Sequence, residues 1–432
     1  MCNTNTIQEP SREIAVSGKF DVIVIGGGIA GVAAAVAAAR NSVRVCLIER
    51  YCGLGGLATL GNVTMWLPLC DGMGNQVIAG LGEELLKLSV ADLKQDNPSA
   101  QFRGVPACWQ PGGNRQERTQ MRYQADFNPA AYMLAIEELV VKAGVKLLYD
   151  TRFCSVRREG MRVSHVIVEN KGGRSALACG VIVDTTGDAD VCVAAGESTL
   201  SLESNVPAGW FYTFRAGELK LHHLSNAYCP VASIEGGQAP FFGGDDAEQV
   251  TAHILQTRKK VRERLRIMRA EHTADDVQLL MPSTTACFRM TRRLVGRFTL
   301  AEQHVHQWFD DTIGLTGDWR RSGPVYAIPY SCLRGVQTSN LLVAGRCISV
   351  DNTAWDVLRA IPPCVVTGEA AGTAAALAAA QAHGDVGSVD CHILQDRLLA
   401  QDVLLDSKLV ATPRKDMNLM DKTPDKVAGD TV

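Results

Sequence analysis

Two apolar runs near the start of the chain flank an alanine-rich stretch. Residues 22–25 are all valine or isoleucine, and residues 43–48 are again mainly apolar. Between them, a glycine-rich turn at 26–31 leads into a stretch dominated by alanine, the residue with the highest helix propensity. Short apolar runs rich in β-branched residues are typical of strands that are buried on both faces, as in parallel sheets. The pattern therefore predicts a strand–helix–strand unit.

Other periodic patterns predict helices farther along the chain. The stretches concerned are 80–92, 129–143, 246–270 and 361–382. Pro129 suits the start of a helix, because the first helical N–H groups have no partner inside the helix. In the third stretch Val261, Leu265 and Met268 fall on one face, opposite a basic face, so we expect an amphipathic surface helix. The fourth is rich in alanine and glycine, which allows close packing on the first sheet.

Further apolar or alternating stretches predict strands. They are 145–149, 163–168, 176–183, 289–298 and 340–345. The second and third alternate in polarity and predict a small meander. In the fourth, Met290, Arg292, Leu294 and Phe298 would share one face. An arginine among apolar neighbours needs either a buried acid or a bound anionic ligand, and the sequence leaves both open.

The glycine turn between the first strand and helix carries the clearest chemical signal. Gly26 allows the tight turn, Gly28 lets the backbone approach a pyrophosphate, and Gly31 lets the helix pack closely on the strand. The N–H groups of Ile29 and Ala30 would face the phosphates at the helix N-terminus. Glu49 follows the second strand, where an acid accepts hydrogen bonds from an adenosine ribose. We expect a dinucleotide site here, and Glu49 suits the ribose of NAD as well as that of FAD.

The loop after Glu49 makes a resemblance specific. The run from Arg50 through a Leu-Gly-Gly-x-Ala-Thr segment at 54–59 resembles the bacterial FAD-dependent oxidoreductases of the glutathione-reductase-type superfamily. Three later stretches are similar to motifs of the same family: 184–190, 289–298 and 340–349. Two departures stand out: Met290 occupies a position where the family usually has an acid, and Arg320 replaces the histidine of a D-x-H triplet that begins at Asp318.

The resemblance implies FAD as the cofactor and a set of residues that contact it. Thr186 and Gly187 would lie by the pyrophosphate, and Arg346 suits a pyrophosphate better than a ribityl hydroxyl. Either Phe153 or Cys154 would supply a backbone contact to adenine. The full cofactor-binding set that we expect is Gly26, Gly28, Ile29, Ala30, Gly31, Glu49, Arg50, Gly55, Gly56, Leu57, Ala58, Thr59, Cys154, Thr186, Gly187, Asp188, Gly345, Arg346 and Ile361.

These observations predict an α/β fold: a Rossmann-like FAD-binding domain with a parallel sheet and a β-meander, plus an inserted α+β substrate domain. The FAD-binding domain would consist of three segments, with the substrate domain and a loop or lid between them. The expected boundaries are a polar tail at 1–19, FAD-binding segments at 20–95, 125–195 and 324–405, a loop or lid at 96–124, a substrate domain at 196–323 and a polar tail at 406–432.

The composition of the chain limits the kinds of partner that we expect. The 43 lysines and arginines against 46 acids give a net charge of −3, so no overall field recruits nucleic acid or an anionic membrane. The 14 cysteines form no CxxC pair and no apolar leader precedes them, which predicts buried free thiols in a reducing cytoplasm and no metal site. We expect a small-molecule substrate and an external electron donor or acceptor. The oligomeric state stays open.

The sequence indicates fewer catalytic residues than cofactor-binding ones, and the evidence for them is weaker. Arg292 and Tyr326 are our candidates, and no spacing compels either role. The pair His222–His223 reads as a surface loop. The function expected is an FAD-dependent oxidoreductase that passes a hydride between a small organic substrate and flavin N5. The alternatives are an NAD-dependent dehydrogenase and a flavin-binding protein that serves a partner.

Overall fold

A seven-stranded mixed sheet forms the centre of the protein in the computed structural model, which describes residues 7, 10–93, 102–224, 241–273 and 276–411. The strand order is β5-β2-β1-β8-β7-β6, and β16 also pairs with β8. Their bounds are β1 (Val16–Ile25), β2 (Val45–Ile48), β5 (Lys146–Leu148), β6 (Arg152–Glu159), β7 (Arg162–Asn170), β8 (Gly173–Asp184) and β16 (Leu341–Val343). The first half of β8 pairs antiparallel with β7, and its last residues pair parallel with β16. The predicted parallel sheet and β-meander are therefore continuous through β8.

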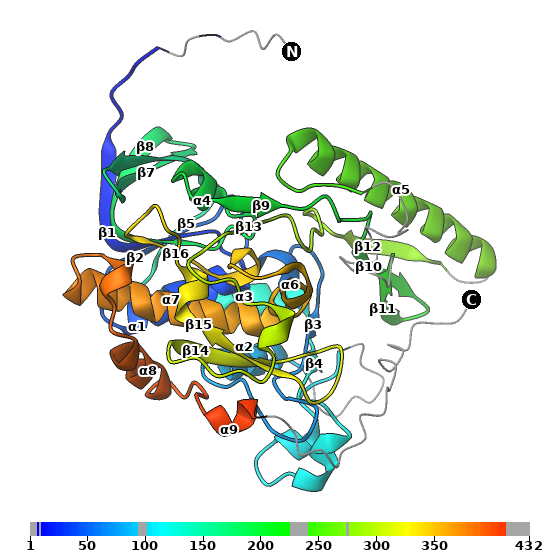
Figure 1. The fold of residues 1–432 in the computed structure, drawn as a ribbon. Helices are drawn as coiled ribbons and strands as arrows, with labels where there is room; N and C mark the ends of the chain where they lie inside the picture. Colours follow the sequence, from blue (N-terminus) through cyan, green and yellow to red (C-terminus); the bar gives the residue numbers. More distant parts are fainter. Residues whose placement is uncertain (1–6, 8–9, 94–101, 225–240, 274–275, 412–432) are drawn as a thin grey trace.

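Helices α1 (Ile29–Arg40) and α7 (Ile361–Gln381) pack against each other beside this sheet (Figure 1). Gly368 and Gly372 of α7 make this possible, because a Cβ on either would collide with the carbonyl oxygen of Ala30 or Ala34 in α1. Gly368 and Gly372 thus pack on α1, and α7 also contacts β8 and β1 of the sheet, where we expected it to pack.

Helix α7 is the one helix in the described part of the chain that is long and apolar enough to cross a membrane. Its most apolar stretch of 18 residues is 89% buried inside the protein. The apolar composition of α7 therefore reflects its place in the core, between α1, the sheet and the β14 strand.

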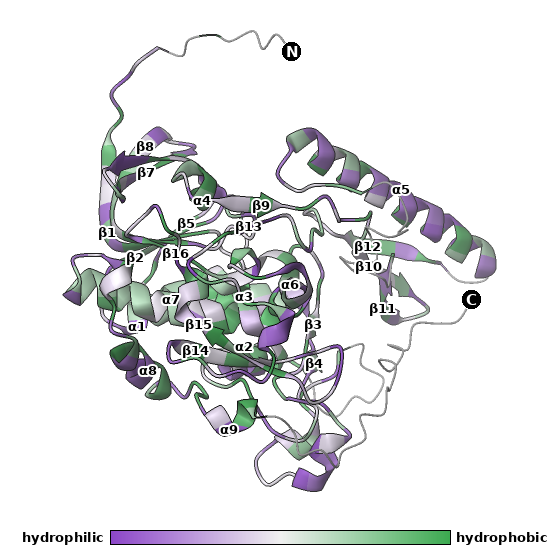
Figure 2. Ribbon diagram, in the orientation of Figure 1, coloured by the Kyte–Doolittle hydropathy of each residue, from purple (hydrophilic) through white to green (hydrophobic). Residues whose placement is uncertain are grey.

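A second, smaller unit extends to one side of the sheet (Figure 1). It is a three-stranded antiparallel sheet of order β11-β10-β12, covered by the long helix α5. The bounds are β10 (Trp210–Arg215), β11 (Glu218–His223), β12 (Gln278–Pro282) and α5 (Ala247–Glu271). Val261, Leu265 and Met268 of α5 are buried with Phe211 and Val277, while Figure 2 shows α5 as largely hydrophilic. The predicted amphipathic helix is confirmed.

The remaining elements are short. The two-stranded pairs are β3 (Met65–Trp66) with β4 (Ala125–Asp126), β9 (Thr199–Ser201) with β13 (Arg292–Leu294), and β14 (Thr312–Gly317) with β15 (Val325–Pro329). The other helices are α2 (Leu81–Val90), α3 (Pro129–Lys142), α4 (Asp190–Ala194), α6 (Asn352–Leu358), α8 (Cys391–Leu399) and α9 (Ser407–Val410). Asn128 caps α3 one residue before Pro129, as expected for a proline-led helix.

Several sequence expectations differ from the structure. Of the predicted strand 289–298, only Arg292–Leu294 is a strand. The pair His222–His223 lies on β11, where the two rings stack on Phe211 and Trp210, and not in a surface loop. The expected boundary between 323 and 324 falls inside the β14–β15 hairpin. Much of the tail at 406–432, and residues 96–101 of the expected loop or lid, lie outside the described residues.

Candidate cofactor and active site

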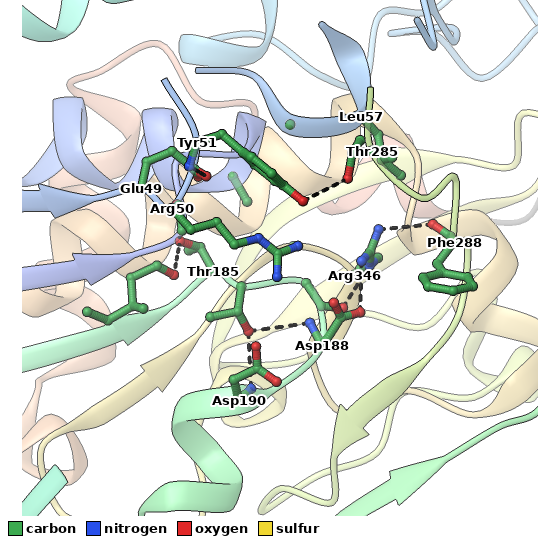
Figure 3. A pocket seen from close by; sticks show the side chains of 18 of the residues that line it. Glu49, Arg50, Tyr51, Leu57, Thr185, Asp188, Asp190, Thr285, Phe288 and Arg346 are labelled. Carbon is green, nitrogen blue, oxygen red and sulfur yellow. Dashed lines mark hydrogen bonds and ion pairs between the residues drawn. The ribbon is translucent and has the colours of Figure 1, made fainter. Parts of the chain in front are cut away.

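A cavity of about 560 Å³ lies at the carboxyl ends of β1, β2, β8 and β16. In parallel α/β sheets, ligands bind beyond this edge, because the loops that follow the strands converge there. The glycine turn after β1, the loop after β2, the turn after β8 and the turn after β16 all line it. Figure 3 shows the cavity with Tyr51 lying across it and Arg50 beside it.

The glycine turn has the geometry that its sequence predicts. Gly26 has φ +105°, a conformation that favours glycine. A Cβ on Gly31 would collide with the carbonyl oxygen of Gly26, so Gly31 permits close packing and does not line the cavity. A Cβ on Gly28 would meet no protein atom within 4 Å, so the protein leaves open space at this point of the turn. Helix α1 begins here with no side-chain cap, so its first N–H groups are available to an anion.

Glu49 is fixed in place by the backbone around it. Its Oε2 accepts a hydrogen bond from the N–H of Gly27 at 2.6 Å, and its Oε1 accepts one from the N–H of Tyr51 at 2.8 Å. Burial raises the pKa of this carboxyl, since few water molecules solvate the charge. Glu49 is 7% exposed and lines the cavity. The side chain is therefore held in one orientation before any ribose binds.

The loop after Glu49 returns to the glycine turn. Gly55 pairs with Gly28 as an isolated parallel bridge, and Gly56 also lies against Gly28. Both glycines have positive φ, 98° and 55°, which explains why the loop needs them. Thr59, which we expected at the cofactor, does not line the cavity. Its hydroxyl instead donates to the carbonyl of Leu54 inside the loop.

The turn after β8 is held by its own side chains. Asp184 is fully buried and accepts hydrogen bonds from the N–H groups of Val191 and Cys192, so it caps α4. The hydroxyl of Thr185 donates to the carbonyls of Ile25 and Gly26, which ties this turn to the glycine turn. Sequence analysis missed both roles, although the acid and the hydroxyl stand directly before the residues it singled out.

Two arginines at the cavity pair with acids of this turn. Arg346 Nη2 lies 2.8 Å from Asp188 Oδ1, while Nε of the same side chain donates to the carbonyl of Gly187 and Nη1 donates to that of Phe288. Burial lowers the pKa of Arg346, but the charge of Asp188 outweighs it and leaves this pKa raised. Arg292 Nη2 lies 2.7 Å from Asp190 Oδ1. Its Nη1 lies 3.8 Å from Asp245 Oδ2. Of the two partners left open for Arg292, the structure shows acids, although the side chain of Asp190 is 43% exposed.

The acid that pairs with Arg292 is itself perturbed. Burial, together with the nearby charges of Asp188 and Asp184, raises the pKa of Asp190 to about 6 despite the opposing charge of Arg292. Three carboxylates thus lie within one turn of about seven residues at the cavity. Arg346 offsets the charge of Asp188, and Arg292 offsets that of Asp190. This wall of the cavity therefore does not repel an anionic cofactor.

The cavity gathers nearly all the cofactor residues that the sequence predicts. Those that line it are Gly26, Gly28, Ile29, Ala30, Glu49, Arg50, Gly55, Gly56, Leu57, Ala58, Cys154, Thr186, Gly187, Asp188, Gly345, Arg346 and Ile361. Gly31 and Thr59 lie behind it. Of the catalytic candidates, Arg292 lines the cavity and Tyr326 does not, because its ring is fully buried in β15. The structure therefore removes Tyr326 from the candidates.

Sequence analysis missed one wall of the cavity. Gly244 precedes α5, and Val250 and Ile254 lie in the first two turns of α5. Thr285, Ala286 and Phe288, which precede β13, complete this wall. The Tyr51 hydroxyl lies 3.4 Å from the Thr285 hydroxyl, so this wall meets the loop after β2 (Figure 3). Arg359 and Cys364, at the N-terminus of α7, also line the cavity. Apolar residues on a helix face and an arginine before a proline carry no local signal of such a site.

These residues fit an FAD molecule. The open space at Gly28, the uncapped N-terminus of α1 and the carboxylate of Glu49 supply sites for a pyrophosphate and a ribose. A second uncapped helix N-terminus, that of α7, lies at the same cavity, with Ile361 in its lining. We find no group of metal-ligating side chains among the described residues.

The family comparison agrees with this geometry. The family model of the FAD dependent oxidoreductases matches residues 21–205 and 203–398, so the chain belongs to that family. It is an enzyme, and its cofactor is FAD.

The chain is also similar in structure to solved proteins of low identity. One is a geranylgeranyl bacteriochlorophyll reductase-like protein from Thermoplasma acidophilum, with a TM-score of 0.43 and 12% identity over 91% of this chain and 90% of that one. Another is p-nitrophenol 4-monooxygenase PnpA from Pseudomonas putida DLL-E4, with a TM-score of 0.43 and 10% identity over 88% and 84% of the two chains.

Proposed function

We propose that this oxidoreductase transfers a hydride between a small organic substrate and N5 of its FAD, and that it belongs to the glutathione-reductase-type superfamily. The observation that carries the proposal is the convergence of four separate turns, after β1, β2, β8 and β16, on one cavity. The order of these turns along the chain matches the order of the motifs on which the resemblance rests.

The chain's own residues would bind the two halves of the cofactor at different places. Glu49 and the start of β6, with Cys154, lie on the side where the adenosine half is expected. Leu57, Ile361 and Cys364 line the rest of the cavity, where the flavin half is expected. The N-terminus of α7 supplies a partial positive charge to that part of the cavity. When bound, FAD supplies the hydride-accepting centre of the reaction. The protein's part is to position that centre, orient the substrate and limit access of water.

A substrate would approach between the two units of the structure. Val250 and Ile254 of α5 present apolar side chains to the cavity, and Phe288 adds an aromatic ring on the same wall. Apolar walls with a few polar groups are typical of sites for small organic molecules. The expected exchange of electrons with an external donor or acceptor would use the same opening, since the sequence contains a single dinucleotide fingerprint.

The test begins with the purified protein. A tightly bound flavin gives absorbance bands near roughly 370 and 450 nm, and heating should release it. Anaerobic mixing with a panel of small alcohols, amines and acids should then bleach the band near roughly 450 nm for at least one substrate class. A yellow protein whose band no hydride donor bleaches, but which one-electron carriers reduce, would contradict the proposed hydride transfer.

A further inference from the structure

Helix α5 carries a row of arginines that begins at the cavity. Val250 and Ile254 of this helix line the cavity. Three exposed arginines continue at the same interval of four residues: Arg258, Arg262 and Arg266. Residues four apart are neighbours on the surface of a helix, so all five side chains follow one row along α5. The row therefore leads from an apolar wall of the cavity to a basic surface outside it.

Positive charge is concentrated on this part of α5. Residues 258–269 contain seven lysines and arginines and one acid, which gives this stretch a net charge of +6. Because the whole chain carries −3, the remainder carries −9. Figure 1 shows α5 at the outer edge of the smaller unit, and Figure 2 shows it as largely hydrophilic. We call the exposed surface of Arg258, Lys259, Arg262 and Arg266 the basic face of α5.

The row of arginines works against the stability of its own helix. Like charges four residues apart repel each other and destabilise a helix. Helices α2 and α3 avoid this, since Lys87 lies 2.6 Å from Glu83 and Lys142 lies 2.7 Å from Glu138, each acid four residues earlier. Within the part of the chain that the structure describes, the three arginines of the row form no ion pair. Acids that would neutralise them must come from a partner.

A compact acidic protein fits the basic face better than a membrane or a nucleic acid does. A helix that lies in a membrane surface inserts its apolar face among the lipids. The apolar face of α5 is already occupied, because Val261, Leu265 and Met268 are buried in one cluster with Phe211. A nucleic acid extends well beyond one helix, and the remainder of the chain, at −9, would repel its phosphates.

The position of the basic face indicates what such a protein would do. Arg258 follows Ile254 by one turn, which is about 6 Å along the helix axis, so a protein bound there lies beside the cavity. The sequence contains a single dinucleotide fingerprint, so electrons need an external carrier. Complexes that exchange electrons are small and weak, and complementary charges speed their formation.

We propose that the basic face of α5 docks the acidic surface of an electron-carrier protein, which exchanges electrons with FAD beside Val250 and Ile254. This inference rests on the proposed function and names the partner of that reaction. A hydride from the substrate brings two electrons and one proton. Two carrier molecules take up one electron each, in turn, and the proton leaves to water. When the substrate is reduced instead, electrons and proton flow in the opposite direction.

The test uses the FAD-bound protein, with its flavin reduced photochemically in the absence of oxygen. It is mixed with oxidised cytochrome b5, an acidic haem protein, or with cytochrome c, a basic one, and the haem absorbance reports electron transfer. We expect the rate constant for cytochrome b5 to fall roughly 10-fold or more as salt is raised from 10 mM to about 0.5 M, because salt screens the attraction. A rate constant that does not depend on salt would overturn the proposal.

A triple variant locates the docking surface. With Arg258, Arg262 and Arg266 all replaced by Gln, the rate constant for cytochrome b5 at low salt should fall roughly 10-fold or more, and that for cytochrome c should not fall. Glutamine has nearly the helix propensity of arginine, so the variant should fold and hold FAD. Should it lose FAD, Arg262→Gln alone decides: it should give an intermediate rate constant, and the parent's value would contradict the proposal.

The matched control changes the net charge by the same three units at exposed sites away from α5. It combines Lys87→Gln, Lys142→Gln and Arg157→Gln, whose side chains are 61%, 71% and 70% exposed, and it should keep the parent's rate constant. An equal loss in the two triple variants would assign the effect to overall charge and overturn the proposal.

Two further outcomes separate the possible errors. If the parent protein sediments with phosphatidylserine vesicles and the α5 triple variant does not, while both reduce cytochrome b5 equally, the basic face binds a membrane and the proposal is wrong. Because the flavin is reduced by light, the docking test needs no substrate. Transfer to cytochrome b5 that depends on α5, in a protein that no small molecule reduces, would refute the proposed hydride transfer and leave the docking surface standing.

Discussion

Glu369, in the middle of α7, accepts a hydrogen bond from the backbone N–H of Leu81 at 3.0 Å, and so a buried carboxyl caps the start of α2. Glu369 is 2% exposed, and burial raises its pKa to about 8. The helix it caps begins at Leu81 and follows Gly80, which has φ +56° and no side chain to form a cap of its own. The contact joins residues that are far apart in the sequence.

This contact predicts a pH dependence of stability. Because the folded state binds the proton of Glu369 more tightly than the unfolded chain, the contribution of Glu369 to stability is greatest at low pH and falls as pH rises from about 4.5 to about 8. Glu369→Gln should remove a decline on the order of 3–5 kcal/mol over that range, since an amide oxygen can still accept from Leu81. Urea unfolding between pH 5 and 8 measures it. Glu138→Gln, at an exposed acid paired with Lys142 on α3, is the control and should keep the parent's pH profile.

Cofactor retention should depend on Gly28 without any effect on folding. A valine there meets no protein atom near its Cβ, and the backbone has φ −64°, so the apoprotein should fold normally. The added side chain would occupy the space of the pyrophosphate, and we expect FAD affinity to fall roughly 100-fold or more. Fluorescence titration of the apoprotein with FAD measures this. Gly104→Val, at another open position, should bind FAD normally; a Gly28→Val protein that remained fully yellow would refute the site.

The packing of α7 on α1 should not tolerate one added methyl group. Alanine normally stabilises a helix relative to glycine by about 1 kcal/mol. At Gly372 the new Cβ would collide with the Ala34 carbonyl, so we expect Gly372→Ala to cost about 1–3 kcal/mol in the free energy of unfolding. Gly104→Ala is the control, because its Cβ would meet no atom within 4 Å, and it should be neutral or stabilising. A stabilising effect at Gly372 would mean that the helices can separate freely.

Removal of the Arg346 guanidinium should destabilise the folded protein. Arg346→Gln leaves Asp188 and the carbonyls of Gly187 and Phe288 without their donor in a buried site. We expect a loss of about 3–5 kcal/mol, measured by chemical unfolding of the apoprotein. Lys142→Gln breaks a surface pair with Glu138, and its effect should be below about 0.5 kcal/mol. A loss of FAD affinity at unchanged stability would instead assign Arg346 to the cofactor.

The first strand–helix–strand unit could be predicted from the sequence because its signals are local. The apolar run of β1, the positive φ at Gly26 and the close contact at Gly31 each follow from residues within one short segment. The same holds for α5, whose apolar spacing fixes its buried face. Where a local pattern determines the conformation, prediction and structure agree.

The parts that were missed depend on partners distant in the sequence. The segment of β11 is mostly polar, so His222 reads as a loop residue until Phe211 of the neighbouring strand is seen to stack on its ring. Tyr326 looks like a candidate acid until the structure shows it fully buried in β15, opposite Thr316 of β14. The ion pair of Arg320 with Asp356 joins two segments 36 residues apart, and no spacing along the chain encodes it.

The close packing of Gly368 and Gly372 on α1 also affects the order in which the fold can assemble during protein synthesis. A ribosome releases α1 long before it releases β16 and α7, so the nascent chain exposes the inner face of α1 until most of the polypeptide has been synthesised. The complete cavity can therefore form only late in biosynthesis, and premature termination before residue 340 would give a chain with three of the four turns that line it but without β16 and α7.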